Sequence, residues 1–237
     1  MTKNKISENE HCQHGDHSHK GCVGAVPIFN HLEDEQMNEI MVTVRSVAYK
    51  KGEHIYHADD EADSLYIVNK GKVRIYRLSQ SGKEQLVRML NPGDFTGELA
   101  LFKEEKHESY AEAIHDTEIC VMKRDDLQAF LLKYPTISLK ILSEFSNRLD
   151  EAEIQTTRFA TEKVETRLAL FLADCVSEDD DNYEFVLPLS KKDLAAYLGT
   201  TPETISRKLA TLEEQGYIKQ KQHKKIQILD LDGLLLI

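Results

Sequence analysis

The chain has 237 residues, of which 41% are hydrophobic; that is enough for one large domain or two modest ones and argues against wholesale disorder. A formal charge of -11 speaks at first against nucleic-acid binding, because affinity for DNA comes largely from Lys and Arg. There is no apolar run of roughly 18 residues and no apolar signal core, and the 4 cysteines are too few for a secreted disulfide scaffold, so we expect a cytoplasmic protein with reduced thiols.

Residues 1–24 form a polar arm without hydrophobic periodicity. Six side chains that can bind metal or undergo redox chemistry lie within one short stretch of it: His11, Cys12, His14, His17, His19 and Cys22. We treat this arm as a segment separate from the folded domains that follow.

Residues 25–132 are expected to form a β-roll sensor domain. A short helical signal in 28–47 precedes runs of alternating β-branched and aromatic residues in 48–123. Turn signals at Lys51-Gly52, Asn69-Lys70-Gly71, Ser81-Gly82 and Asn91-Pro92-Gly93 separate these runs. Such regular turns predict a small antiparallel barrel or sandwich.

Residues 133–160 are expected to form a long helix that mediates dimerisation. Asp125 or Asp126 is expected to cap a short helix through Leu132, and the long helix begins after Pro135. Its apolar residues follow a 3-4 spacing that is typical of a coiled-coil seam: Leu142, Phe145, Leu149, Ala152 and Phe159. The alternative is a helix packed on its own domain, but the polar residues around this stripe favour a seam between two chains.

Residues 161–237 contain a pattern typical of a helix-turn-helix. Ser190 has the capping-box spacing to Asp193, and Gly199 supplies the left-handed position that ends the first helix. Thr201 then caps a second helix that begins with Pro202. Three residues at core spacing, Ile205, Leu209 and Leu212, leave the other face of this helix free for the major groove of DNA.

The polar residues of this second helix and of the following hairpin are the candidate DNA contacts. Arg207 can donate to guanine and Glu203 can accept from cytosine. The full set of expected DNA-binding residues is Thr201, Glu203, Ser206, Arg207, Lys208, Lys224 and Lys225, and Lys219 and Lys221 also lie on the predicted wing. Residues 190–225 carry 8 basic and 4 acidic side chains, a local charge of +4 that leaves -15 for the remainder.

A β-roll, a long seam helix and a C-terminal winged helix, in that order, resemble the CRP/FNR family of bacterial transcription regulators over nearly the whole chain. The segment NPGDFTGELALF (91–102) looks like the cyclic-nucleotide cassette of the family, and PETISRKL (202–209) looks like the FNR-type recognition helix. The resemblance implies an α+β fold and a homodimer that reads a palindrome of TTGAT-like half-sites. It also implies RNA polymerase as a partner.

The cassette departs from the cyclic-AMP-binding pattern at one charged position. Counting from the turn Gly97-Glu98-Leu99, the Arg-Ser pair of cyclic-AMP-binding members becomes Glu108-Ser109. A carboxylate repels a phosphate, which argues against cyclic AMP but leaves an uncharged or cationic ligand of the β-roll open. No nucleophile–base pair accompanies Glu98 and Glu108, so we do not expect an enzyme.

Three interpretations of the cysteines and histidines stay open. By resemblance, Cys120 occupies the position of the β-roll cysteine that helps to hold the iron–sulfur cluster of FNR, but Cys12 and Cys22 leave that four-cysteine set one ligand short. In the first, a zinc or iron–sulfur site combines Cys12 or Cys22 and Cys120 with one or two of His11, His14, His17 and His19. In the second, Cys22 and Cys120 form a reversible disulfide. In the third, the arm is a tail that binds metal weakly. Cys175 is interpreted as a small core residue.

Overall fold

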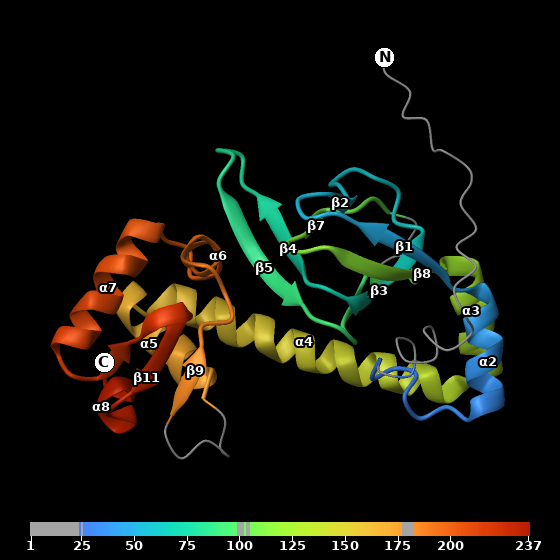
Figure 1. The fold of residues 1–237 in the computed structure, drawn as a ribbon. Coiled ribbons are helices and arrows are strands. Elements are labelled where there is room, and N and C mark those ends of the chain that lie inside the picture. Colours follow the sequence, from blue (N-terminus) through green and yellow to red (C-terminus); the bar gives the residue numbers. More distant parts are fainter. Residues whose placement is uncertain (1–23, 25, 99–101, 103–104, 177–182) are drawn as a thin grey trace.

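The computed structural model describes residues 24, 26–98, 102, 105–176 and 183–237 (Figure 1). Seven residues that the sequence singles out lie outside the described residues: His11, Cys12, His14, His17, His19, Cys22 and Leu99. The acidic turn at 178–181 lies outside them as well.

The N-terminal half is the expected antiparallel β-roll. After helix α2 (Asp34–Thr43), its strands are β1 (Arg45–Tyr49), β2 (His54–Tyr56), β3 (Ser64–Lys70), β4 (Val73–Leu78), β5 (Glu84–Leu90), β6 (Phe95–Thr96), β7 (Tyr110–Ala113) and β8 (Thr117–Lys123). They form two four-stranded sheets in the orders β1-β8-β3-β6 and β2-β7-β4-β5. The four predicted turns are confirmed, because Gly52, Gly71, Gly82 and Gly93 all have the positive φ that glycine adopts without strain.

Two helices connect the β-roll to the C-terminal half. Helix α3 (Arg124–Lys133) follows β8 directly, and helix α4 (Pro135–Thr161) then runs along the β-roll and into the C-terminal half (Figure 1). The prediction that Asp125 or Asp126 caps α3 is wrong. The cap residue is Lys123, because β8 passes into the helix without a loop, and both carboxylates lie in the first turn, where the helix dipole favours them.

The C-terminal half is the expected winged helix-turn-helix. It consists of α5 (Val164–Asp174), β9 (Glu184–Val186), α6 (Lys191–Tyr197), α7 (Pro202–Glu214), β10 (Ile218–Gln220), β11 (Lys225–Ile228) and α8 (Leu231–Leu235). The sheet order is β10-β11-β9, so the predicted hairpin gains a third strand. Helix α8 was not expected from the sequence, because five residues are too few to show a helical period.

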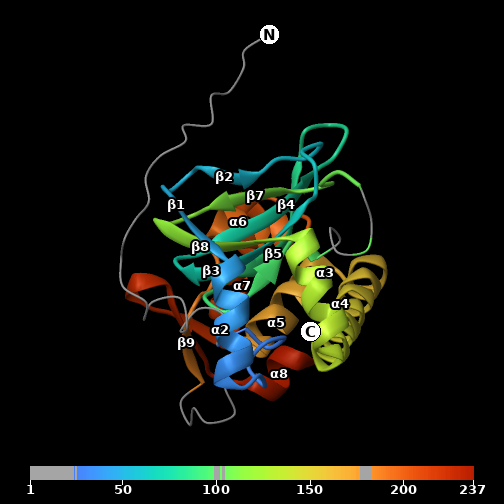
Figure 2. The ribbon, with the colours of Figure 1, turned by 90° about the vertical axis from the view of Figure 1, so that its right-hand side faces the viewer.

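The buried cores explain how the halves are joined. One cluster lies between the first sheet, helices α2 and α3, which Figure 2 shows at one end of the roll, and the start of α4. It includes Ile67, Cys120 and Ile141. The core of the C-terminal half also includes Leu86 of β5, so the β-roll packs directly on the DNA-binding half. None of the described helices has both the length and the apolar composition that crossing a membrane requires.

Candidate nucleic-acid interface and effector pocket

Both helices of the helix-turn-helix begin as the sequence predicts. The Ser190 hydroxyl accepts a hydrogen bond from the Asp193 backbone N–H at 3.1 Å, and the Thr201 hydroxyl accepts one from the Thr204 N–H at 3.3 Å. These bonds satisfy backbone donors that the first turn of a helix leaves free. The start of α7, and hence the direction in which its first side chains point, is therefore fixed by local chemistry.

Gly199 sets the angle between α6 and α7. Its φ is +68°, and a Cβ atom there would lie 3.0 Å from Cε1 of Phe159 on helix α4. The turn therefore needs glycine at this position for two reasons, the left-handed backbone and the close approach of a bulky ring. This contact attaches the helix-turn-helix to the end of the long helix.

Helix α7 has one buried and one open face. Ile205, Leu209 and Leu212 are buried, whereas Glu203, Ser206 and Arg207 are exposed, as expected. Lys208 differs from the other candidate DNA contacts. Its Nζ atom donates to Glu165 Oε2 at 2.7 Å, so this half-buried lysine is turned toward α5 and away from the open face.

The wing presents the predicted lysines, but a carboxylate holds two of them. Lys219, Lys221, Lys224 and Lys225 are all exposed. Glu184 on β9 accepts from Lys225 Nζ at 2.9 Å and also from Lys221 Nζ, and these bonds lower the pKa of Glu184. At the wing tip, Lys224 follows His223 and both have a φ of 60°, a conformation that non-glycine residues adopt at a cost.

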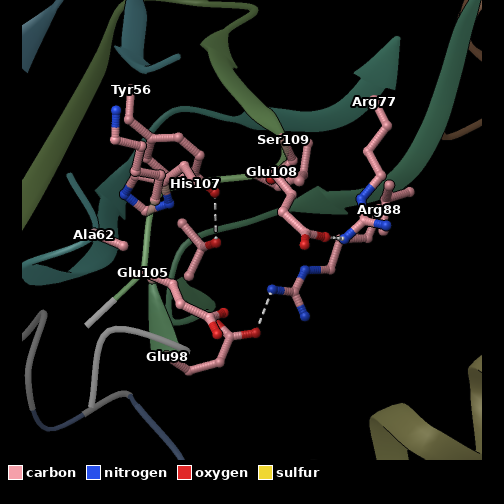
Figure 3. Close-up of a pocket in the computed structure, with 14 residues that line it drawn as sticks. Tyr56, Ala62, Arg77, Arg88, Glu98, Glu105, His107, Glu108 and Ser109 are labelled. Carbon is pink, nitrogen blue, oxygen red and sulfur yellow. Dashed lines mark hydrogen bonds and ion pairs between the residues drawn. The ribbon is translucent and has the colours of Figure 1, made fainter. Parts of the chain in front are cut away.

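A cavity of about 520 Å³ opens in the β-roll at the cassette (Figure 3). Gly97, Glu98, Glu108 and Ser109 line it. Gly97 permits the turn, since its φ is +85° and a Cβ atom would lie 2.3 Å from the carbonyl oxygen of Ser64. The polar cassette residues that the structure describes therefore line one cavity.

Glu98 and Glu108, the two cassette carboxylates of this cavity, pair with arginines that no sequence motif indicated. Glu108 accepts from Arg77 at 2.6 Å, and Glu98 accepts from Arg88 at 2.7 Å and from Arg148 of α4 at 2.6 Å. Burial alone would raise the pKa of Glu98, but the two guanidinium groups hold it below its ordinary value. The arginines come from three separate elements, so no spacing in the sequence could have indicated them.

His107 completes the cavity wall. Its ring stacks on Tyr56 with 3.7 Å between centroids, and burial lowers its pKa, which favours the neutral imidazole. Among the described residues, its Nε2 atom and Glu98 Oε2 have no hydrogen-bond partner although both are buried. Polar atoms in this state indicate a cavity in which a ligand or water completes the bonding.

Comparison with known proteins identifies the family. The Cyclic nucleotide-binding domain model matches residues 46–134, and the Crp-like helix-turn-helix domain model matches residues 166–237. The chain is 32% identical to the "Probable transcriptional regulator flp" of Lacticaseibacillus casei, over 90% of this chain and 96% of the relative. The chain belongs to the CRP/FNR family of transcription regulators.

Two further relatives show the breadth of the CRP/FNR family around this chain. The "Cyclic AMP receptor protein" of Thermus thermophilus is 28% identical, with 81% of this chain and 88% of the relative covered. The structure of FixK2 from Bradyrhizobium japonicum superposes with a TM-score of 0.68 at 29% identity, covering 81% of this chain and 95% of that one. The CRP/FNR fold is thus confirmed, and membership alone leaves the effector open.

The two cysteines that the structure describes have different surroundings. Cys120 on β8 is 0% exposed and lies in the cluster that also takes in Val26, Ile28 and Phe29. Cys175 caps the end of helix α5 and is half-buried outside the core clusters, so its interpretation as a core residue is not confirmed; its partial burial raises its pKa to about 11. No group of three or more metal-binding side chains forms within the described ranges, so any site with the arm lies beyond what they test.

Proposed function

We propose that this CRP/FNR regulator is a homodimer that reads a palindrome of TTGAT-like half-sites through helix α7. The observation that carries the proposal is the open face of α7, on which Glu203, Ser206 and Arg207 are exposed together at the start of a capped helix. Hydrogen bonds from its own backbone N–H and from Thr201 lower the pKa of Glu203, so it is ionised and can accept from cytosine. RNA polymerase is the further partner that we propose from the family resemblance.

The two-fold symmetry of a palindrome requires two copies of α7 held at a fixed distance. Helix α4 supports this, because Leu142 and Leu149 stay exposed on it and Ala152 is exposed beside them. Phe145 and Phe159 are half-buried against their own chain, where Phe145 meets Phe102 and Phe159 meets Gly199. Leu139 is exposed too, so the proposed seam consists of Leu139, Leu142, Leu149 and Ala152.

Arg207→Ala tests the reading of DNA. The variant should lose about 1–3 kcal/mol of binding to a TTGAT palindrome and should tolerate substitution at one base pair of each half-site. Fluorescence anisotropy on operator, substituted and random duplexes measures both effects. Lys224→Ala is the matched control, since loss of a phosphate contact weakens every duplex alike and reduces the salt dependence. Equal losses on operator and random DNA for Arg207→Ala would refute the assignment.

We infer that the signal enters as a change of redox or metal state at the N-terminal arm and Cys120. The position of Cys120 supports this, because the residues that follow the arm, Val26 to Phe29, pack in the same cluster. Its complete burial adds a condition, since a partner can reach the thiol only if this packing opens. Zinc, an iron–sulfur cluster and a Cys22–Cys120 disulfide would each hold the arm against the β-roll.

The Cys120→Ser variant tests whether the signal acts through Cys120. Cys175→Ser is the matched control variant. Operator affinity of the unmodified protein, purified without oxygen and assayed before and after oxidation, should differ between the two states by about fivefold or more. Cys120→Ser should abolish that difference and Cys175→Ser should keep it. Metal analysis and the visible spectrum separate zinc, which is colourless, from an iron–sulfur cluster. A metal-free protein with the same affinity in both states would exclude every form of the switch.

A second candidate function is regulation by a small molecule in the β-roll cavity. It is favoured by the buried, unpartnered atoms His107 Nε2 and Glu98 Oε2, which line a cavity of suitable size. Glu108 on the same wall disfavours cyclic AMP, so calorimetry should detect no binding of that nucleotide. Heat of binding for cyclic AMP that disappears in Glu98→Gln would overturn this interpretation of the cassette.

A further inference from the structure

A second cavity lies where the β-roll, helix α4 and the DNA-binding half meet. Its volume is about 600 Å³, within the range of small-molecule sites. Its walls come from β5, from the second half of α4, and from α5 and α6, the region of Figure 1 where the long helix passes between the two halves. It shares only Val87 and Arg88 with the β-roll cavity, so the two sites are distinct.

Positive charge is concentrated in this cavity. Five basic side chains line it, against the two carboxylates of Glu151 and Asp174: Lys72, Arg88, Arg148, Arg158 and Arg167. The whole chain has the opposite balance, with a charge of -11. Arg88 and Arg148 bond to Glu98, and Arg158 bonds to Asp174. Lys72 and Arg167 are the lining cations that bond to backbone carbonyl oxygens and to no carboxylate among the described residues. Cations without a carboxylate partner favour an anionic occupant.

Arg167 is the arginine of this lining that has no carboxylate partner among the described residues. Its guanidinium donates to two backbone carbonyl oxygens, Glu162 O at 2.9 Å and Leu198 O at 3.0 Å, and its Nε–H is buried without a partner among the described residues. Burial without a carboxylate lowers the pKa of this arginine. An anion in the cavity would supply the missing counter-charge to this guanidinium.

The rest of the lining is suited to an apolar body. Phe171 and Tyr197 lie 5.7 Å apart between ring centroids, and Phe159 lies beneath the Arg167 guanidinium at 4.9 Å. All three rings border the cavity. Rings beside a cationic group are typical of sites that hold the apolar part of a ligand and orient its charged end.

We propose that this interdomain cavity binds a small organic anion, with its carboxylate, sulfonate or phosphate at Arg167 and Arg158 and its apolar or aromatic body against the three rings. Such a ligand contacts the β-roll, the long helix and the DNA-binding half at once. It would therefore stabilise one arrangement of these parts. The site is independent of whatever signal acts at Cys120.

A pair of fluorescent probes tests the charge requirement. 8-Anilinonaphthalene-1-sulfonate has an aromatic body and a sulfonate, and N-phenyl-1-naphthylamine has the same body without the charge. The full-length protein should bind the sulfonate saturably, one molecule per chain, and at least about tenfold more tightly than the neutral probe. Equal affinity for the two probes would overturn the proposal.

Three variants locate the binding. Arg167→Gln and Arg158→Gln should each weaken the sulfonate about tenfold and leave the neutral probe unchanged. Arg77→Gln, which alters only the β-roll cavity, should bind both probes as the unmodified protein does. Among the described residues, the Arg158 side chain is bonded to the exposed Asp174 alone, so its variant remains informative if Arg167→Gln fails to fold. Unchanged affinity for the sulfonate in Arg158→Gln, or loss of that affinity in Arg77→Gln, refutes the site.

Binding of operator DNA is measured in the absence of either probe. A negative result with the probes is therefore distinct from a failure of the proposed DNA-binding function.

Discussion

The carboxylate of Glu184 limits how many wing lysines are free to contact DNA. Glu184 is bonded to Lys221 and Lys225, two of the four wing lysines. The sequence places all four lysines on the wing, but it gives no indication that a residue outside the hairpin pairs with two of them. Strand β9 brings Glu184 there through its pairing with β11, in which Glu184 lies opposite Gln227.

Glu184→Gln should therefore strengthen DNA binding. Two lysines lose an internal partner and become free for phosphates, so affinity should rise for operator and random DNA alike. The slope of log affinity against log salt should steepen by about 1–2 units. Anisotropy titrations over a series of salt concentrations measure both quantities. Glu214→Gln removes the same charge from an exposed position at the end of α7, and a steepening equal in both variants would exclude a specific role for Glu184.

Arg74 lies at the centre of an ion-pair cluster between the β4–β5 hairpin and the helix-turn-helix. It lies on β4, is 9% exposed, and bonds to Glu112 of β7 at 2.6 Å and to Glu84 of β5 at 2.9 Å. It also lies 3.6 Å from Asp193 of α6, the residue to which the capping Ser190 donates. Lys192 of α6 approaches Glu84 at 3.5 Å, so this cluster connects the β4–β5 hairpin to the helix-turn-helix.

Arg74→Gln should destabilise the protein strongly. The change leaves three partly buried carboxylates without their shared cation, and breaking one partner of such a cluster costs about 3 kcal/mol or more. Urea unfolding followed by circular dichroism measures the loss of unfolding free energy. Arg77→Gln removes the same charge from an exposed position on the same strand and should change stability by less than about 0.5 kcal/mol. Equal effects in the two variants would mean that the Arg74 cluster contributes no net stability.

The elements themselves were largely predictable, because each is encoded locally. Glycine turns, apolar alternation and the caps at Ser190 and Thr201 are properties of a few consecutive residues, and all are confirmed. Apart from the cap of α3 and the short helix α8, the failures have one cause, which is that long-range packing leaves no period in the sequence. Phe145 fits the seam spacing, yet it packs on the β-roll, whereas Leu139, six residues earlier, is exposed. The partners of Glu98 and Glu108 are equally remote in sequence.

Across the whole molecule, charge and exposed apolar surface favour one assembly. The +4 segment at 190–225 belongs to the wing and recognition helix, while the remainder carries -15, so only the C-terminal face attracts DNA. Helix α4 meanwhile leaves three leucines in solvent, Leu139, Leu142 and Leu149, with exposures of 68%, 60% and 59%. A second copy that covers these side chains would present two recognition helices on one face of the dimer.

Leu149→Lys should separate the two copies. Each copy loses the burial of a leucine worth about 1.5–3 kcal/mol and gains a charge in the seam, and symmetry doubles the effect, so the dissociation constant of the dimer should rise at least about a hundredfold. Sedimentation velocity measures this directly. Affinity for the full palindrome should fall as dimerisation is lost, while weak binding to a single half-site persists because α7 is unchanged.

Leu132→Lys is the control, since Leu132 is 86% exposed but lies on α3, outside the proposed seam. If Leu149→Lys stays dimeric at the same concentration as the control, the copies must associate through another surface. The spacing of the two recognition helices would then have to be derived from that surface instead of from α4.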